Sequence, residues 1–150
     1  MSRTESVPRT ESGDVLTDVV MRTFRLYGAF LDAAEVMTKP VGLTAAWWQV
    51  LGAVLREPLS VSGIAREMGL ARQSVQRIAD LLVDKGLAEY LPNPAHARAK
   101  LVRPTPEGFA AIERLRDAQH EWANRVSAQV SLEDLRTTLA TMTALVAATS

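Results

Sequence analysis

Arginine and glutamine side chains are concentrated near the middle of the chain, between Arg72 and Arg77. Guanidinium and carboxamide groups form paired hydrogen bonds with base edges, arginine with guanine and glutamine with adenine. On a helix, residues three and four positions apart share a face, so these groups would be presented together. The segment therefore predicts a surface that reads the bases of double-stranded DNA. Its base-reading candidates are Gln73, Ser74, Gln76 and Arg77, and Arg72 is expected to hold a phosphate.

These side chains need a rigid support, and the segment from Leu59 to Gly86 predicts two short helices joined by a tight turn. Ser60 is the expected N-cap of the first helix, and Gly69 supplies a left-handed turn residue. A rotation of about 100° per residue along the second helix puts its apolar residues on one buried side. These residues are Val75, Ile78, Ala79 and Leu82. The spacing is that of a helix-turn-helix, although the stretch taken alone also fits an ordinary helical hairpin in a core.

Two short strands are predicted directly after this unit, at residues 87–91 and 100–103, with a turn rich in proline between them. A hairpin in that position is a wing. His96 and Arg98 lie at its tip and Lys100 follows, where basic groups would hold phosphates or enter an adjacent minor groove. For His96, a solvated loop position is the alternative. Pro104 is expected to fray the end of the second strand, because proline lacks an N–H group.

Composition limits the function classes that remain open. The 150 residues suit one domain, and 47% hydrophobic with 23% charged residues is typical of a globular protein. There is no cysteine, which excludes a disulfide framework. The uncharged runs are shorter than the ~18 residues of a membrane span, and no signal segment is evident, so we expect a cytoplasmic protein without a membrane partner.

Charge is distributed unevenly along a chain whose net charge is zero. Residues 56–103 contain eight basic and five acidic residues, a net charge of +3, and the remainder carries −3. Because affinity for DNA depends on neutralising phosphates, this mild polarity predicts modest, salt-sensitive binding.

Long helices are predicted at both ends of the chain. One begins at about Asp14 and ends before Pro40, a second starts at the Thr105-Pro106 cap and continues through Val126, and a third follows a capping box at Ser131. A shorter helix, capped by Thr44 and stopped by Pro58, leads into the central unit. The apolar faces of the long helices exceed what a small domain can cover, which predicts a homodimer.

The order of these elements resembles the MarR family of bacterial transcriptional regulators. The resemblance rests on two segments, LARQSVQRIADLLVDKGLAEY and NPAHARAKLVRPTPEG. It implies a homodimer whose recognition helices enter successive major grooves and read a palindromic operator, usually as a repressor. His96, Ala97 and Arg98 stand where the family commonly has an aspartate and two consecutive arginines, which implies a weaker or more pH-sensitive wing contact.

The expected fold class is therefore mainly α, a winged helix-turn-helix with a two-stranded β-wing and long N- and C-terminal dimerisation helices. Residues 1–13 are expected to form a flexible tail, 14–42 and 105–150 a helical dimerisation region, and 43–104 the DNA-binding domain.

The resemblance also implies a small-molecule effector, aromatic or anionic, bound between the dimerisation helices and the reading domain. Adjacent residues on a helix point in different directions, so one of Trp47 and Trp48 is expected in the core. The aromatic residues that could line the pocket are Tyr27, Phe30, Trp47, Trp48 and Trp122, and ordinary packing is the alternative for each.

Other functions find little support in the sequence. His96 and His120 are the only histidines, so a zinc site is not expected, and no cofactor is implied. No catalytic pairing or phosphate-binding glycine loop is evident, so an enzyme is not expected. The alternative function is a winged-helix protein-interaction module without DNA binding. The zero net charge, together with Asp80 and Asp84 on the reading helix, favours that alternative.

Overall fold

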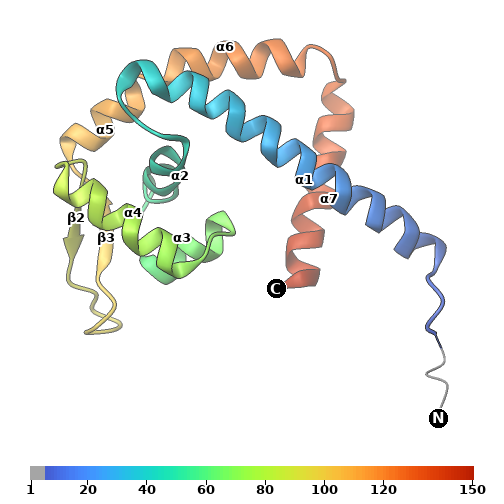
Figure 1. The fold of residues 1–150 in the computed structure, drawn as a ribbon, viewed down its shortest axis with the longest axis horizontal. Helices are drawn as coiled ribbons and strands as arrows, with labels where there is room; N and C mark the ends of the chain where they lie inside the picture. Colours follow the sequence, from blue (N-terminus) through green and yellow to red (C-terminus); the bar gives the residue numbers. More distant parts are fainter. Residues whose placement is uncertain (1–5) are drawn as a thin grey trace. The chain divides into compact units, whose positions relative to one another are not determined.

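The computed structural model describes residues 6–150, which form a mainly helical fold with a small antiparallel sheet, the predicted class (Figure 1). The chain divides into two units, one ending at Ala45 and one beginning at Ala46. The elements, in chain order, are α1 (Glu11–Thr38), the 3-10 turn η1 (Lys39–Val41), α2 (Ala45–Ala53), β1 (Leu59–Ser60), α3 (Val61–Met68), α4 (Arg72–Asp84), β2 (Ala88–Leu91), β3 (Leu101–Pro104), α5 (Pro106–Glu113), α6 (Arg116–Ser127) and α7 (Leu132–Thr149).

Helices α3 and α4 form the predicted helix-turn-helix. The hydroxyl oxygen of Ser60 accepts a hydrogen bond from the amide of Gly63 at 3.1 Å, which caps α3. Gly69 ends α3 at φ +64°, a left-handed conformation that a β-carbon disfavours. The buried residues of α4 are the four predicted from the helical period: Val75, Ile78, Ala79 and Leu82.

The sheet has the strand order β1-β3-β2, with both pairings antiparallel. Strands β2 and β3 are the expected wing, but the prediction of two strands missed β1, whose Leu59 pairs with Val102. Two residues are too short to show the alternation by which a strand is recognised in a sequence. The expectation of fraying at Pro104 was wrong, because Pro104 is buried and in register with Ala88. Pairing continues past it, since the Thr105 amide donates to the Leu87 carbonyl at 3.2 Å.

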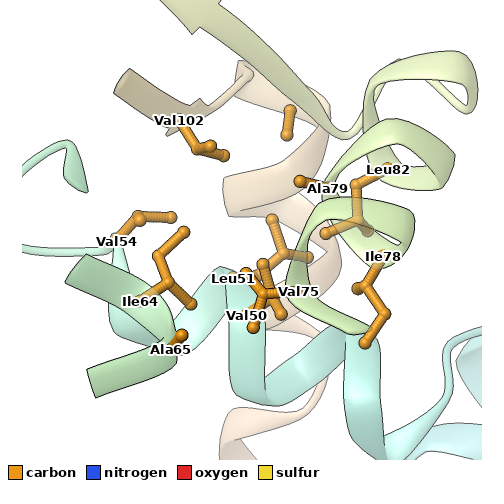
Figure 2. Close-up of a cluster of buried hydrophobic side chains, with 11 residues drawn as sticks. Val50, Leu51, Val54, Ile64, Ala65, Val75, Ile78, Ala79, Leu82 and Val102 are labelled. Atoms are coloured by element: carbon orange, nitrogen blue, oxygen red, sulfur yellow. The ribbon is translucent and has the colours of Figure 1, made fainter. Parts of the chain in front are cut away.

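One hydrophobic cluster joins α4 to the wing formed by β2 and β3 (Figure 2). Leu51 of α2, Ile64 of α3, Leu82 of α4 and Val102 of β3 are all fully buried in it. Each buried aliphatic side chain contributes roughly 1.5–3 kcal/mol relative to exposure. Because the cluster draws on α2, α3, α4 and β3, it fixes the position of α4 relative to the wing.

Several helix boundaries differ from those predicted. Helix α1 begins at Glu11, so residues 11–13 are helical and do not belong to the expected tail, of which residues 1–5 lie outside the described chain. Helix α2 ends at Ala53, before the expected stop. The single helix expected from residue 106 to 126 is divided into α5 and α6 around Leu115, which is only 1% exposed. The amide of Leu115 bonds to the Ile112 carbonyl at 2.9 Å, and this tighter turn interrupts the α-helical ladder.

Candidate nucleic-acid interface

A groove of about 410 Å³ lies between α4 and the wing, with the first residues of α3 at its side. Five of the residues predicted to contact DNA line it: Arg72, Gln76, His96, Arg98 and Lys100. These residues come from α4 and from the loop that joins β2 to β3, which are separate in the sequence. The fold therefore brings one predicted base-reading residue, Gln76, together with the four predicted phosphate and wing residues on one concave surface.

The remaining base-reading candidates lie beside this groove on α4. Gln73 and Arg77 are exposed and line a shallower hollow together with Gln76, whereas Ser74 is partly buried. Arg72 occupies the first turn of α4, and the N-cap residue Ala71 has no side chain that could accept a hydrogen bond from the helix. The first amides of α4 are thus without a side-chain cap, and a helix N-terminus with a nearby arginine suits a phosphate oxygen.

A hydrogen-bonded triad joins the reading helix to the wing. The side-chain nitrogen Nε2 of Gln76 lies 3.0 Å from Asp80 Oδ1 and 3.1 Å from the Tyr90 hydroxyl oxygen, and that hydroxyl donates a hydrogen bond to Asp80 Oδ1. Burial raises the pKa of Tyr90 to about 12, and the hydrogen bond to Asp80 and its charge add to this effect. Tyr90 is therefore a neutral donor at physiological pH.

Tyr90 was not among the residues predicted from the sequence, and Asp80 was expected only as a feature that favours the protein-interaction alternative. The triad pairs a residue on a strand with residues that precede it by 10 and 14 positions. No helical or strand period connects such positions. The available signal was a tyrosine in the strand that follows the reading helix, which a sequence alone does not distinguish from a packing residue.

The wing tip is built around the imidazole of His96. Its Nδ1 accepts hydrogen bonds from the amides of Arg98 at 3.3 Å and Ala99 at 3.2 Å. The amide of His96 in turn donates to the Asn93 carbonyl at 3.2 Å. A ring nitrogen that accepts from two amides carries no hydrogen, so the hydrogen of the neutral ring is on Nε2. His96 therefore organises the turn that presents Arg98.

Opposite charges brace the base of the wing. Arg103 and Glu89 face each other across β2 and β3, and the Arg103 Nε donates to Glu89 Oε1 at 2.9 Å. Lys100 lies with its Nζ 5.9 Å from the centre of the Tyr90 ring, a cation–π distance. The charge of Arg103 is thus engaged within the wing, while Arg98 and Lys100 face the groove.

Comparison with known proteins identifies the protein family of this chain. The MarR family model matches residues 41–99. A MarR family transcription regulator of known structure is 26% identical, with 88% of each chain covered and a TM-score of 0.71. The chain belongs to the MarR family.

Further relatives extend this likeness over most of the chain. An uncharacterized protein of Mycobacterium tuberculosis is 34% identical over 125 residues, which are 83% of this chain and 87% of that protein. A mutant of E. coli MarR in complex with operator DNA is 18% identical, with a TM-score of 0.73 over 91% of this chain and 99% of that one. At that identity the likeness is one of fold. The MarR family consists of transcription regulators rather than enzymes, in agreement with the role expected from the sequence.

The aromatic residues expected to line an effector pocket have different surroundings in this MarR-family chain. Trp47 packs against the hydrophobic cluster, as expected for one of the two adjacent tryptophans. Trp48 lines a hollow of about 250 Å³ with residues of α5 and α6, among them Ile112 and Gln119. Trp122 is partly buried on α6. Tyr27 and Phe30 belong to the unit that ends at Ala45 and are 45% and 44% exposed.

Residues 6–150 contain no cluster of three or more histidine, aspartate or glutamate side chains that could hold a metal ion. None of the helices in that range is both long and apolar enough to span a bilayer.

Proposed function

We propose that this chain is a sequence-specific transcription regulator that binds double-stranded DNA. The observation that carries the proposal is the groove between α4 and the wing, lined by Arg72, Arg98, Lys100 and the Gln76 carboxamide. Cationic groups on both sides of a groove suit the phosphates that border a DNA groove, and the exposed amides and guanidinium groups of α4 suit base edges. The operator complex of the E. coli relative supports the same use of this fold.

In the proposed complex, α4 enters the major groove with its N-terminal half first. Arg72, Gln73, Gln76 and Arg77 lie in that half, whereas Asp84 is the last residue of the helix. Phosphates repel the carboxylate, so the C-terminal half is the less favourable end to insert. The wing then lies over the adjacent backbone, where Arg98 holds a phosphate or enters the minor groove and Lys100 neutralises a second phosphate.

The proposed unit of binding is a homodimer on a palindromic operator. Within the described chain, α7 has no buried residue and α1 has only Thr38. Both helices nevertheless carry rows of exposed apolar side chains, which include Val20, Phe24 and Tyr27 in α1 and Leu135, Leu139 and Met142 in α7. A two-fold partner would cover these rows, with residues 14–42 and 105–150 as the dimerisation region and 43–104 as the reading domain.

The proposed dimer also provides a way to regulate DNA binding. The proposed outcome of binding is repression, released by an aromatic or anionic small molecule that favours a spacing of the two reading domains unmatched to the operator. Trp48, beside the hollow at α5 and α6, is the aromatic residue placed to report such binding by fluorescence. A regulator of this kind works where the genome is, which in a bacterium is the cytoplasm.

The experiment that tests the proposal is titration of the purified protein onto DNA from its own upstream region, with a scrambled duplex of the same composition as control. Specific binding that weakens steeply as salt rises is the expected result, because phosphate contacts release counterions. Equal, weak binding to both duplexes, followed by no enrichment from a random DNA pool, would contradict it.

The second candidate function is a protein-interaction module. It is favoured by the zero net charge and by the shallow hollow on α4 where Leu81 is exposed beside Asp80 and Asp84. The same DNA experiment separates the two functions, since an interaction module enriches no DNA sequence.

A further inference from the structure

The Gln76 carboxamide lies against two oxygen atoms of the protein. Its Nε2 is 3.0 Å from Asp80 Oδ1 and 3.1 Å from the Tyr90 hydroxyl oxygen, and these two oxygens are hydrogen-bonded to each other. A carboxylate only accepts hydrogen bonds, so the carboxamide atom that faces the pair must be the nitrogen and not the oxygen. The orientation of the Gln76 carboxamide is therefore set by its partners.

These contacts leave Gln76 able to bind a base. The two oxygens lie on the same side of the nitrogen, because they are in hydrogen-bond contact with each other, so one N–H group serves both. The other N–H group of a planar carboxamide points in a different direction, and the carbonyl oxygen takes no part in these contacts. Gln76 therefore keeps one donor and one acceptor, which are the kinds of group that a glutamine uses to contact adenine.

Tyr90 gives the pair of oxygens a fixed position. It lies in β2, in register with the fully buried Val102 of β3, and its ring packs against the hydrophobic cluster. The hydroxyl is rigidly attached to the ring, so it lies where the strand and the cluster place it. The exposed side chain of Gln76 is thus held from outside its own helix.

Such support changes how well a glutamine discriminates between bases. Immobilising a flexible side chain on a base costs free energy at the moment of binding, and a side chain already held in the free protein avoids part of that cost. The saving favours DNA only where the base offers groups that match the held orientation. Support of the carboxamide therefore increases discrimination at the contacted position.

We infer that Tyr90 is a positioning residue for base reading, which together with Asp80 holds the Gln76 carboxamide in place for its contact in the major groove. The inference rests on the proposed function. It gives Asp80 a role within a DNA-binding surface, because its carboxylate accepts hydrogen bonds from Tyr90 and Gln76. It also assigns part of the base specificity to a strand outside α4.

The base position read by Gln76 is found first, by selecting binding sites from a random duplex pool with the full chain and with Gln76→Ala. The position at which the variant loses its preference is the one that Gln76 contacts. Duplexes with each of the four bases at this position are then compared by competition. Adenine is the base expected for the wild-type chain.

Tyr90→Phe removes only the hydroxyl and keeps the ring that packs against the hydrophobic cluster. The preference for adenine over the other three bases at this position is expected to fall by about threefold to tenfold, the cost of immobilising one flexible side chain. Asp80→Asn keeps an acceptor oxygen and should retain more of the preference than Asp80→Ala. The matched control is Asp84→Asn, which removes a carboxylate at the end of α4 and should leave the base ratios unchanged.

A double substitution separates positioning of Gln76 from general support of the wing. Adding Tyr90→Phe to Gln76→Ala should change operator affinity by less than about twofold, because the side chain that Tyr90 positions is absent. An equal loss of affinity on adding Tyr90→Phe to the wild-type chain and to Gln76→Ala overturns the inference, since Tyr90 would then only hold the wing. Equal base ratios in the wild-type chain and Tyr90→Phe overturn it as well.

A measurement without DNA keeps the inference separate from the proposed function. The Nε2 group of Gln76, assigned by the loss of its NMR signals in Gln76→Ala, is expected to have an order parameter above about 0.6 in the free protein and a lower one in Tyr90→Phe. An order parameter below this value in the wild-type chain overturns the inference. Failure to enrich any DNA sequence instead overturns the proposed function and, with it, the base-reading role of Tyr90.

Discussion

In the proposed DNA complex, the side chains of the interface divide into those that face DNA and those that hold other groups in place. Arg77 and Gln73 are exposed on α4, where they line a shallow hollow, whereas Gln76 is hydrogen-bonded to Tyr90 and Asp80. Residues of the first kind determine which bases are contacted. Residues of the second kind determine where the contacting groups lie, so their substitution acts on DNA binding through the side chain that they position.

The first residue-scale prediction concerns Arg77. Arg77→Ala should cost about 1–3 kcal/mol on the cognate operator and flatten discrimination at one base pair, because a paired contact with guanine is lost. Fluorescence anisotropy with cognate and scrambled duplexes measures both effects. Arg125→Ala, which removes the same charge from an exposed position of α6, is the control. An equal loss on both duplexes would make Arg77 a phosphate contact instead.

A second prediction concerns His96 at the wing tip. Its Nδ1 accepts from the amides of Arg98 and Ala99, so His96→Ala leaves two amides of the turn without their acceptor. Arg98 then loses its fixed position in the turn. DNA affinity should fall by about threefold to tenfold, which corresponds to the loss of one hydrogen bond from Arg98 to DNA. His96→Asn keeps a short acceptor and should retain most of the affinity. If Asn and Ala weaken binding equally, the acceptor role is wrong.

The ionisation of Tyr90 gives a third prediction. In a Tyr27→Phe background Tyr90 is the only tyrosine, and its phenolate absorbance should appear with a pKa of about 12. A folded pKa above the unfolded value of 10.0 favours the neutral form, so this stabilisation is present below pH 10 and is lost as the pH rises toward 12. Replacing Asp80 with Asn should lower the pKa, since Asp80 supplies two of the causes that raise it. An unchanged pKa in Asp80→Asn would contradict the triad.

At the scale of elements, the base of the wing is joined to α5 by close backbone contact. The Thr105 hydroxyl donates to the Gly86 carbonyl at 2.6 Å and accepts from the Gly108 amide at 3.1 Å. The turn after α4 and the start of α5 are therefore tied to the same side chain. A shift of α5 would be transmitted to the wing base through this contact.

Gly108→Ala tests that junction. A β-carbon at Gly108 would lie 2.0 Å from the Leu87 carbonyl oxygen, a backbone atom that cannot rotate away, so we expect a loss of about 1–3 kcal/mol in the free energy of unfolding. The control is Gly52→Ala in α2, where nothing lies within 4 Å of the added atom and a gain of up to about 1 kcal/mol is expected. Urea denaturation measures both. Equal free energies of unfolding for the two variants would show that the backbone at this junction moves to accommodate the added β-carbon.

Some features of these elements could be predicted from the sequence, and others could not. The buried face of α4 and the caps at Ser60 and Gly69 were predicted because they depend on residues within one or two helical turns. Strand β1 was missed because its two residues become a strand only by pairing with β3. The Gln76 and Tyr90 contact was missed for a related reason, since it exists only after α4 has packed against the wing.

At the scale of the whole molecule, the proposed dimer rests on the exposed apolar rows of α1 and α7. A closed two-fold interface contains every contact residue twice, so one substitution places two charges in it. Leu139 in α7 is 68% exposed and Phe24 in α1 is 67% exposed. Neither side chain is therefore part of the buried core of the single chain. Charging them should therefore break the dimer without unfolding the chain, because burial of an unpaired carboxylate is costly only at the interface.

Leu139→Glu and Phe24→Glu are accordingly expected to sediment as a species of 16.4 kDa, the mass of one chain, with unchanged helical circular dichroism. Operator affinity should fall steeply in both variants, since a single reading domain contacts only one half-site. Thr137→Glu adds the same charge to an exposed polar position of α7 and should remain dimeric. A wild-type chain that sediments at the monomer mass at all concentrations would contradict the dimer. A dimeric Leu139→Glu variant with full affinity would instead remove α7 from the interface.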